Sequence, residues 1–357
     1  MVVRLAAARS PSAGAPSAEP RSIFVLRNND IGDLLVVTPL FDALRRCYPR
    51  AHLAAGVGHW NLEVLRHNPH LSEVLVVDAP WQNKYTRGAG WGQRLRYVRR
   101  HPQVAKVSAG RFDVGIDVAG TAWGSLLLMR AGIPYRLGVI GYEGGHSAAQ
   151  ALVRFDPGEH VARMALRFAE LLGCQDLPAP RPQIFLDRPE VEEAESWWRL
   201  AQPTARRARI VIAPGGGLPA KLWPAGRFAA VAAALAERHD VTVLTGPVEA
   251  ALAGEVAGSA PLRLAPTPLR QAFAVIAAAD LVVCNSSMAM HAAAAFAKPA
   301  VVLLGQAFPS AAAHQRQWGY PGLTRCLGRE PGGAAEIAST EEAMAVISEL
   351  LTELAAA

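Results

Sequence analysis

Three short segments of this chain place polar, charged or small residues directly after an apolar run, and the first contains Asp33. Asp33 follows Gly32 shortly after an apolar run and stands at the start of a predicted helix. A carboxylate in this place can take the proton of an attacking hydroxyl, which is general base catalysis. Alternatively, it only complements the helix dipole, a role that Asp30 could fill as well. Asp33 is therefore a candidate catalytic base.

The second segment could hold an anionic leaving group. Gly215, Gly216 and Gly217 follow an apolar run and precede Lys221. Successive glycines let backbone N–H groups surround an anion, and a lysine ammonium can neutralise the charge of that anion. The spacing matches neither a Walker loop nor a G-x-G-x-x-G fingerprint. The alternative is a flexible loop followed by a surface lysine.

Glu249 lies shortly after the next apolar run, three residues beyond Gly246. A carboxylate at the end of a strand can accept hydrogen bonds from the vicinal hydroxyls of a ribose. The alternative is a carboxylate in the first turn of a helix. We treat Glu249 as a candidate nucleotide-binding residue.

The third segment begins where the apolar run 281–284 ends. Ser286, Ser287 and Met288 lead into an Ala-rich helical stretch that has His291 in its first turn. Free N–H groups at the start of a helix favour phosphate, and these four residues would lie at the same place. For His291 the alternative is a histidine of the hydrophobic core.

Strands alternating with helices must position these segments, which predicts an α/β protein with parallel sheets covered on both faces. In such sheets ligands bind at the carboxyl ends of the strands. Apolar runs predict strands over 23–27, 52–57, 74–77, 113–118, 210–213, 241–245, 281–284 and 301–304. Helical patterns cover 34–48, 91–109 with a break near Pro102, the stretch after 118 to about 130, 160–172, 189–200, 225–238, 269–278 and 340–354.

The length of 357 residues indicates two domains, because single cores stop growing at about 250–300 residues. Pro178, Pro180 and Pro182 mark the linker between them. We predict a disordered tail over 1–21, an N-terminal domain over 22–185 and a C-terminal domain over 186–357. No apolar run has the length of a membrane span or of a signal peptide, so we expect a cytoplasmic protein.

The net charge of +6 is unevenly distributed, because basic residues with no acidic one among them run from 84 to 111. Arg94, Arg96, Arg99 and Arg100 lie in this segment. They form either a solvated helix face or a surface for an anionic acceptor or the inner membrane leaflet. Nucleic acid is a poorer match, because no nucleic-acid-binding motif accompanies the charge.

The four cysteines are far apart and have no metal-binding spacing. We expect buried thiols in a reducing compartment, with Cys47 and Cys284 inside apolar patterns. No Asp-x-Asp pair or His/Cys cluster is present, so we expect no metal.

The three segments, in this order, resemble glycosyltransferase family 9, the ADP-heptose:lipopolysaccharide heptosyltransferases. The resemblance runs over most of residues 22–350. It rests on a G-D-x-L-x-x-T-P motif, a K-x-W-P motif and an M-H-x-A-A-A motif, which fall here on Gly32, Asp33, Leu35, Thr38 and Pro39, on Lys221, Trp223 and Pro224, and on Met290 to Ala295.

This resemblance implies the GT-B fold, with two Rossmann-like domains that face a central cleft and a last helix that packs back on the first. It implies inverting, metal-independent transfer of a heptose or related sugar from ADP-heptose to a lipopolysaccharide core or other cell-surface glycan, with no cofactor beyond the donor. Asp33 would be the base and Lys221 would stabilise the leaving diphosphate. The N-terminal domain would bind the anionic acceptor, with the arginines at 94–100 in contact with it and with the inner membrane as a peripheral contact.

One segment departs from the family pattern D-[TS]-G-x-x-H. Ser286 replaces the aspartate and Met288 the glycine, so a charge is lost and bulk is added. Three alternatives stay open: a transferase of the same family with another nucleotide sugar, a non-catalytic sugar-nucleotide-binding protein, and a nucleotide-sugar epimerase. An NAD-linked dehydrogenase is disfavoured because no glycine fingerprint follows either first strand.

Overall fold

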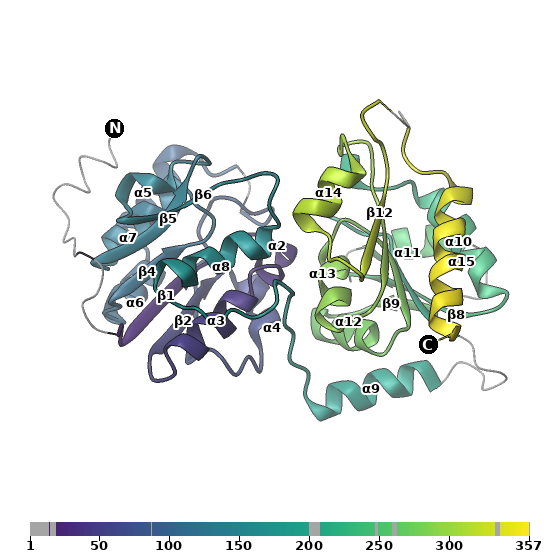
Figure 1. Cartoon of the computed structure of the whole chain (residues 1–357), viewed down its shortest axis with the longest axis horizontal. Helices are drawn as coiled ribbons and strands as arrows, with labels where there is room; N and C mark the ends of the chain where they lie inside the picture. Colours follow the sequence, from purple (N-terminus) through teal and green to yellow (C-terminus); the bar gives the residue numbers. More distant parts are fainter. Residues whose placement is uncertain are drawn as a thin grey trace. The chain divides into compact units, whose positions relative to one another are not determined.

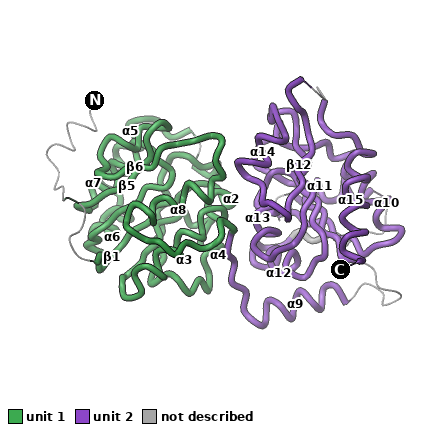
Figure 2. Tube along the Cα trace, viewed as in Figure 1, with its two compact units in different colours: residues 1–181 green, residues 182–357 purple. Residues whose placement is uncertain are grey.

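The structure is a computed structural model that describes residues 14, 19–86, 88–199, 208–246, 249–258, 263–332 and 336–356, without the side chains of 263–266. The chain divides into two compact units, Met1–Arg181 and Pro182–Ala357 (Figure 2). Most of the predicted disordered tail over 1–21 lies outside the described residues. Each unit is described by itself.

Unit 1 is built on a six-stranded, wholly parallel sheet in the order β3-β2-β1-β4-β5-β6. The strand order reverses between β1 and β4, so this is a doubly wound sheet whose switch point lies between these two strands. The strands are β1 (Ser22–Leu26), β2 (His52–Val57), β3 (Glu73–Val76), β4 (Val114–Asp117), β5 (Tyr135–Ile140) and β6 (Ala151–Arg154).

Helices cover both faces of this sheet (Figure 1). One face packs against α3 and α8, and the other packs against α5, α6 and α7, whose buried side chains join Phe24 and Leu26 in one hydrophobic cluster. The helices are α2 (Ile31–Leu35), α3 (Pro39–Cys47), α4 (Leu62–Leu65), α5 (Trp91–Arg100), α6 (Pro102–Ala109), α7 (Ala122–Arg130) and α8 (Val161–Leu171), with 3-10 turns η1 (His59–Asn61) and η2 (Gly145–Ala148).

Unit 2 repeats the same topology with the order β12-β11-β10-β7-β8-β9, all parallel. Its switch point lies between β7 and β10. The strands are β7 (Arg209–Ala213), β8 (Asp240–Thr245), β9 (Arg263–Pro266), β10 (Leu281–Asn285), β11 (Ala300–Leu303) and β12 (Thr324–Leu327).

The helices of unit 2 also form two layers. Helices α10, α11 and α15 share a hydrophobic cluster on one face of the sheet, and α12 packs against both α9 and α13. The helices are α9 (Arg188–Arg199), α10 (Ala225–Ala236), α11 (Ala250–Ala257), α12 (Leu269–Ala277), α13 (Met288–Ala295), α14 (Ala311–Trp318) and α15 (Thr340–Ala356), with the 3-10 turn η3 (Pro219–Lys221).

The predicted α/β class and the parallel sheets are confirmed; one predicted helix has an unexpected interruption, and the break predicted near Pro102 is present. The helix predicted over 34–48 is α2 followed by α3, which starts at Pro39, a residue with no N–H to continue the helix before it. The helix predicted over 91–109 ends at His101, whose backbone is extended (ψ 136°) because the residue before Pro102 disfavours the helical region.

Several elements have no counterpart in the predictions, namely α4, β5, β6, α11, β9, α14 and β12. Four of them, α4, β6, β9 and β12, have only four residues each. A run of that length gives too little periodic signal, and long-range pairing within the sheet stabilises the edge strands instead.

The last predicted helix is α15, and its packing back on the first domain stays a prediction. The buried side chains of α15, Ala343, Ile347 and Leu350, belong to the hydrophobic cluster of unit 2. Helix α10 and strand β11 are among its neighbours.

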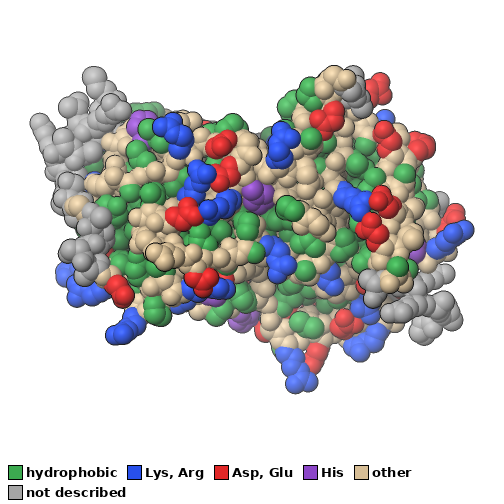
Figure 3. All heavy atoms as spheres, in the orientation of Figure 1, with side chains coloured by type: hydrophobic (Ala, Val, Ile, Leu, Met, Phe, Trp, Pro, Cys, Tyr) green, Lys and Arg blue, Asp and Glu red, His purple; other side chains and the backbone are tan. Residues whose placement is uncertain are grey.

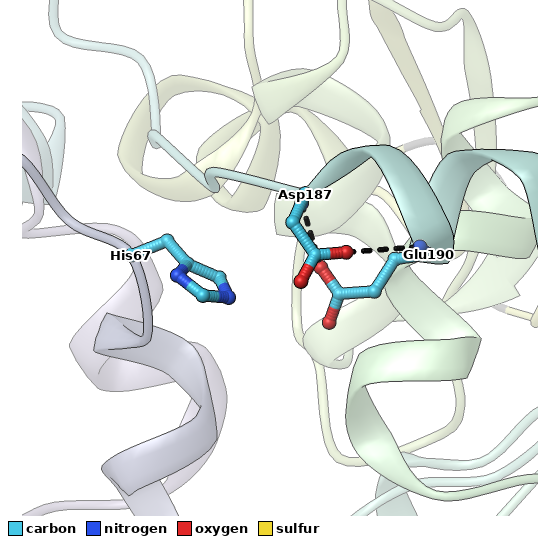
Figure 4. Close-up of side chains that lie close together, drawn as sticks. All are labelled: His67, Asp187 and Glu190. Atoms are coloured by element: carbon cyan, nitrogen blue, oxygen red, sulfur yellow. Dashed lines mark hydrogen bonds between the residues drawn. The ribbon is translucent and has the colours of Figure 1, made fainter.

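Helix α9 starts with a reciprocal cap that fixes the entry of the chain into unit 2. The Asp187 N–H donates to Glu190 Oε2 and the Glu190 N–H donates to Asp187 Oδ1, both at 2.9 Å (Figure 4). Arg270 of α12 donates to both oxygens of Glu190, at 2.7 and 2.5 Å, and thereby ties α9 to α12. His67, which is also drawn in Figure 4, belongs to unit 1.

The expectation that all cysteines are thiols is wrong for two of them. Cys47 at the end of α3 and Cys174 after α8 form a disulfide, with their Cα atoms 5.4 Å apart. Because α3 and α8 pack together on one face of the sheet, residues 127 apart in sequence meet there. Cys284 is a buried free thiol, as expected, and Cys326 is free and half-buried.

None of the helices in the described part of the chain is both long and apolar enough to cross a membrane.

Candidate functional site

In unit 2 the loops that follow β7 and β10 meet at the switch point. The two strands pair with Ala213 opposite Cys284, so the residues just after them are neighbours. The fully buried Asn285 joins these loops, because its side-chain amide donates to the Pro214 carbonyl at 2.5 Å. Its Oδ1 accepts from the Trp223 N–H at 2.8 Å, which fixes a third loop to the same place. The predictions did not assign any role to Asn285.

Gly215 and Glu249, which lie far apart in the sequence, come together at this edge. Gly246 donates its N–H to Glu249 Oε2 at 3.1 Å, which turns the carboxylate toward the loop after β7. A methyl group added at Gly215 would lie 2.6 Å from the same oxygen. Glycine is therefore needed at 215 for close approach, whereas nothing lies within 4 Å of a methyl group added at Gly217.

Lys221 is held by its backbone and presents an exposed side chain. Its carbonyl accepts from the Gly305 N–H at 3.2 Å, just after β11, and the Ala220 carbonyl accepts from Ala307 at 2.9 Å. The ammonium nitrogen lies 5.8 Å from the centre of the Phe308 ring. The loop after β7 therefore places a cation above the carboxyl ends of β10 and β11.

The segment that departs from the family pattern lies at the start of α13. Ser287 is the N-cap, with its Oγ 3.4 Å from the Ala289 N–H, and Met288 is the first helical residue; both are half-buried. Ser286 Oγ lies 2.8 Å from Nε2 of His314, a residue that the sequence did not indicate. His314 is a single histidine that follows three alanines, and nothing in the sequence around it predicts a contact with Ser286.

His291 is 4% exposed, and its Nδ1 lies 2.6 Å from the Tyr320 hydroxyl. Burial raises the pKa of Tyr320 well above its ordinary value, so this hydroxyl stays protonated and can donate to His291. The structure gives His291 a core partner, and its role toward a ligand stays a prediction.

In unit 1 the candidate base lies at the switch point of the other sheet. Asp33 is in the first turn of α2, and its side chain is 32% exposed. Arg27, which directly follows β1, donates from Nε to the Asp33 carbonyl at 3.0 Å and places Nη2 3.5 Å from Asp33 Oδ1. Arg27 therefore holds both the backbone and the carboxylate of Asp33 at this edge.

Asp117 ends the neighbouring strand β4, paired with Leu26 of β1. It is 1% exposed, and its Oδ2 accepts from the Thr121 N–H at 2.9 Å. Burial raises the pKa of Asp117 to about 7, although backbone N–H groups and the charge of Arg27 oppose the shift. The predictions missed this carboxyl, and its place at the end of an apolar strand was the available signal.

The arginines that were predicted to bind the acceptor lie on α5 and do not share one face. Arg99 and Arg100 follow Arg96 by three and four residues, and all three are exposed, whereas Arg94 lies toward the other side of the helix and is half-buried. On the face drawn in Figure 3, basic and acidic side chains are interspersed.

The far end of α5 lies away from the carboxyl edge. Helix α7 starts at the carboxyl end of β4 and runs back toward the start of β5, so its last residue, Arg130, lies at the amino edge. The Arg130 guanidinium donates to the Arg99 carbonyl at 3.5 Å. The structure thus places Arg99 and Arg100 near the amino edge, and it does not bring them together with Asp33.

Among curated proteins, the chain is similar to lipopolysaccharide heptosyltransferase 2 of Escherichia coli K12. The two are 26% identical over 307 residues, which covers 80% of this chain and 83% of the relative.

Two solved structures have the same fold. One is a family 9 glycosyltransferase from Veillonella parvula, with a TM-score of 0.76 and 20% identity over 93% of this chain and 97% of that one. The other is the E. coli ADP-heptose LPS heptosyltransferase II, with a TM-score of 0.71 and 21% identity over 93% and 99%. These likenesses show that the chain has the GT-B fold, as predicted.

The family model for glycosyltransferase family 9 (heptosyltransferase) matches residues 100–317, which include the segments around Lys221 and His291. This chain therefore belongs to glycosyltransferase family 9 and is a heptosyltransferase-like glycosyltransferase.

Proposed function

We propose that this enzyme transfers a heptose, or a closely related sugar, from ADP-heptose to a lipopolysaccharide core or similar cell-surface glycan. The transfer inverts the anomeric carbon in one displacement and needs no metal. The similarity to the E. coli lipopolysaccharide heptosyltransferase and the ADP-heptose in the name of the solved relative support this donor and acceptor.

The observation that carries the proposal is the meeting of three distant segments at the carboxyl edge of β7 and β10. Gly215 packs against the Glu249 carboxylate, and Lys221 is held above the ends of β10 and β11. The N-terminus of α13 begins beside them at Met288. In the proposal, Glu249 accepts from the ribose hydroxyls, while Lys221 and the helix N–H groups bind the diphosphate.

Unit 1 supplies the proton acceptor. The acceptor oxygen forms a bond to the anomeric carbon while its proton passes to the Asp33 carboxylate, and the bond from that carbon to the diphosphate oxygen breaks. The negative charge that develops on the diphosphate is stabilised by Lys221, which takes the place that a divalent cation has in metal-dependent transferases.

A binding titration of the purified protein tests the donor. ADP-heptose, ADP, UDP-sugars and GDP-sugars are titrated in the presence of EDTA. Selective binding of ADP-heptose under these conditions is the expected result. Binding only after addition of a divalent cation, or binding of no nucleotide sugar, contradicts the proposal.

The Asp33→Asn variant tests the base. We expect kcat to fall roughly 10²- to 10⁴-fold, because the amide cannot accept the proton, while the Kd for ADP stays unchanged. Asp176→Asn is the matched control, since it removes the same charge from an exposed residue of unit 1. Turnover of Asp33→Asn at the wild-type rate would exclude Asp33 as the base.

A second candidate is a transferase of the same family that uses another nucleotide sugar. Ser286 and Met288, which replace the aspartate and glycine of the family pattern, favour it. In the same titration it predicts preference for a different donor, with the effect of Asp33→Asn on turnover retained.

A further inference from the structure

Three side chains from separate elements of unit 2 form a continuous polar chain that ends at the donor site. Cys326 of β12 has its Sγ 3.4 Å from Nδ1 of His314 on α14. Nε2 of the same ring lies 2.8 Å from the Ser286 hydroxyl oxygen, directly after β10. Both ring nitrogens are therefore engaged, and the ring orientation is fixed from two sides.

The surroundings keep the side chains of Cys326, His314 and Ser286 uncharged. His314 is 5% exposed, and the Phe308 ring packs edge-on against it at 4.8 Å between ring centres. Burial first, and the nearby charge of Lys221 second, lower the pKa of His314 to about 4. Burial raises the pKa of the Cys326 thiol to about 12, so near neutral pH the thiol is protonated and the imidazole is uncharged.

A neutral imidazole carries one ring N–H, so the direction of one hydrogen bond sets the other. When the Cys326 S–H donates to Nδ1, the Nε2–H must donate to Ser286 Oγ. The hydroxyl hydrogen of Ser286 is then left to point away from His314. With the hydrogen bonds in this direction, both nitrogens of His314 have a partner, and the Ser286 hydroxyl is free to donate to a group outside these three side chains.

We propose that His314 is a positioning residue that orients the Ser286 hydroxyl as a hydrogen-bond donor to the diphosphate of the nucleotide sugar. This inference rests on the proposed function, because it assumes a nucleoside diphosphate at this edge. Relative to the family pattern, Ser286 replaces a charged carboxylate with a neutral hydroxyl, which can donate a hydrogen bond as well as accept one. Lys221 and the start of α13 already favour an anion here.

The test compares the binding of ADP with the binding of adenosine, by calorimetry, in four proteins: wild type, Ser286→Ala, His314→Leu and the double variant. UDP with uridine and GDP with guanosine are used in the same way if the wild type prefers them. We expect each single variant to weaken ADP binding roughly 10- to 100-fold, the effect of one hydrogen bond to a charged group. Adenosine binding should stay unchanged, and the double variant should bind no more weakly than either single one.

Conservative variants separate positioning from bulk packing. In His314→Gln the side-chain amide can still donate to Ser286, so we expect ADP binding within about threefold of wild type. His239→Leu, at the start of β8 on the opposite edge of the same sheet, is the matched control for the loss of a histidine. Thermal unfolding of every variant shows that each one is folded.

Three results would overturn the inference. If His314→Leu is folded and binds ADP like wild type, His314 positions nothing. If the losses of Ser286→Ala and His314→Leu multiply in the double variant, the two residues act separately. If the wild type binds no nucleoside diphosphate at all, the inference fails together with the proposed function, and this result is distinct from the first two.

Discussion

The two units share one sheet topology and differ in what they place at the switch point. In unit 1 the edge between β1 and β4 carries two carboxyls, Asp33 and the buried Asp117, with Arg27 beside them. In unit 2 the edge between β7 and β10 carries Lys221 and the neutral His314. Under the proposed function, the same topology would serve a proton-accepting role in one unit and an anion-binding role in the other.

The difference shows that topology sets where a ligand is bound and the loop residues set which ligand it is. In both units the reversal of strand order separates two loops and leaves room at the carboxyl ends. Unit 2 ties these loops together through Asn285, whereas unit 1 fixes its loop through the Arg27 guanidinium. Function follows from those side chains, because the fold alone hosts many chemistries.

Among changes that test the difference between the two units, we expect Lys221→Ala in unit 2 to have the largest effect on activity. We expect kcat to fall about 10²- to 10³-fold and donor binding to weaken, because a preorganised charge on the leaving diphosphate is lost. Lys298→Ala is the matched control, since Lys298 follows α13 at the opposite edge of the same sheet. Steady-state kinetics and ADP titration measure both, and equal effects of the two variants would contradict the role of Lys221.

The pH dependence of stability should have opposite signs in the two units. Because Asp117 has a raised pKa of about 7, folded unit 1 binds more protons than the unfolded chain above about pH 4. Its free energy of unfolding then falls as pH rises from 4 to 7, by up to about 4 kcal/mol.

For His314 the pKa is lowered to about 4, so the unfolded chain binds more protons below about pH 6.5. Unit 2 therefore loses stability as pH falls from 6.5 to 4, by up to about 3 kcal/mol. Urea unfolding followed by hydrogen exchange in peptides of each sheet measures this. Asp117→Asn should remove the trend in unit 1 alone and His314→Gln the trend in unit 2 alone; equal trends in both units would disprove the assignment.

The smallest expected effect comes from the disulfide, which the structure describes only in unit 1 and which should therefore stabilise that unit alone. Reduction of Cys47–Cys174 should destabilise unit 1 by about 2–4 kcal/mol, because a long loop of the unfolded chain is released. Unit 2 should unfold at the same urea concentration with and without reductant. Cys326→Ser is the control for the loss of an unpaired thiol, and alkylation of all four cysteines in unreduced, unfolded protein would contradict the disulfide.

Much of the fold could be predicted from local patterns. The strand at 52–57 and the strand start at Leu281 are where the apolar runs place them, because a buried parallel strand is a short continuous apolar run. The break at His101 follows from Pro102 alone, and the sequence analysis predicts it at this place. Strands such as β12 could not be found, because their stability comes from pairing with β11 and not from their own residues.

The candidate site divides in the same way. The types and order of Gly32-Asp33, Lys221 and Met290-His291 were enough to indicate the family, which is a property of the sequence by itself. Local motifs can show this because each one spans only a strand end and the turn after it.

Only the tertiary structure could show that Asp117 lies beside the strand that leads to Asp33, or that His314 reaches Ser286 across 28 residues. It alone pairs Cys47 with Cys174, which the sequence left as separate thiols. The physical reason is that periodicity reports which face of an element is buried, whereas strand order and helix packing decide which loops meet. The sequence therefore determined the family and many of the elements, and the packing of each unit determined the partners of the site residues.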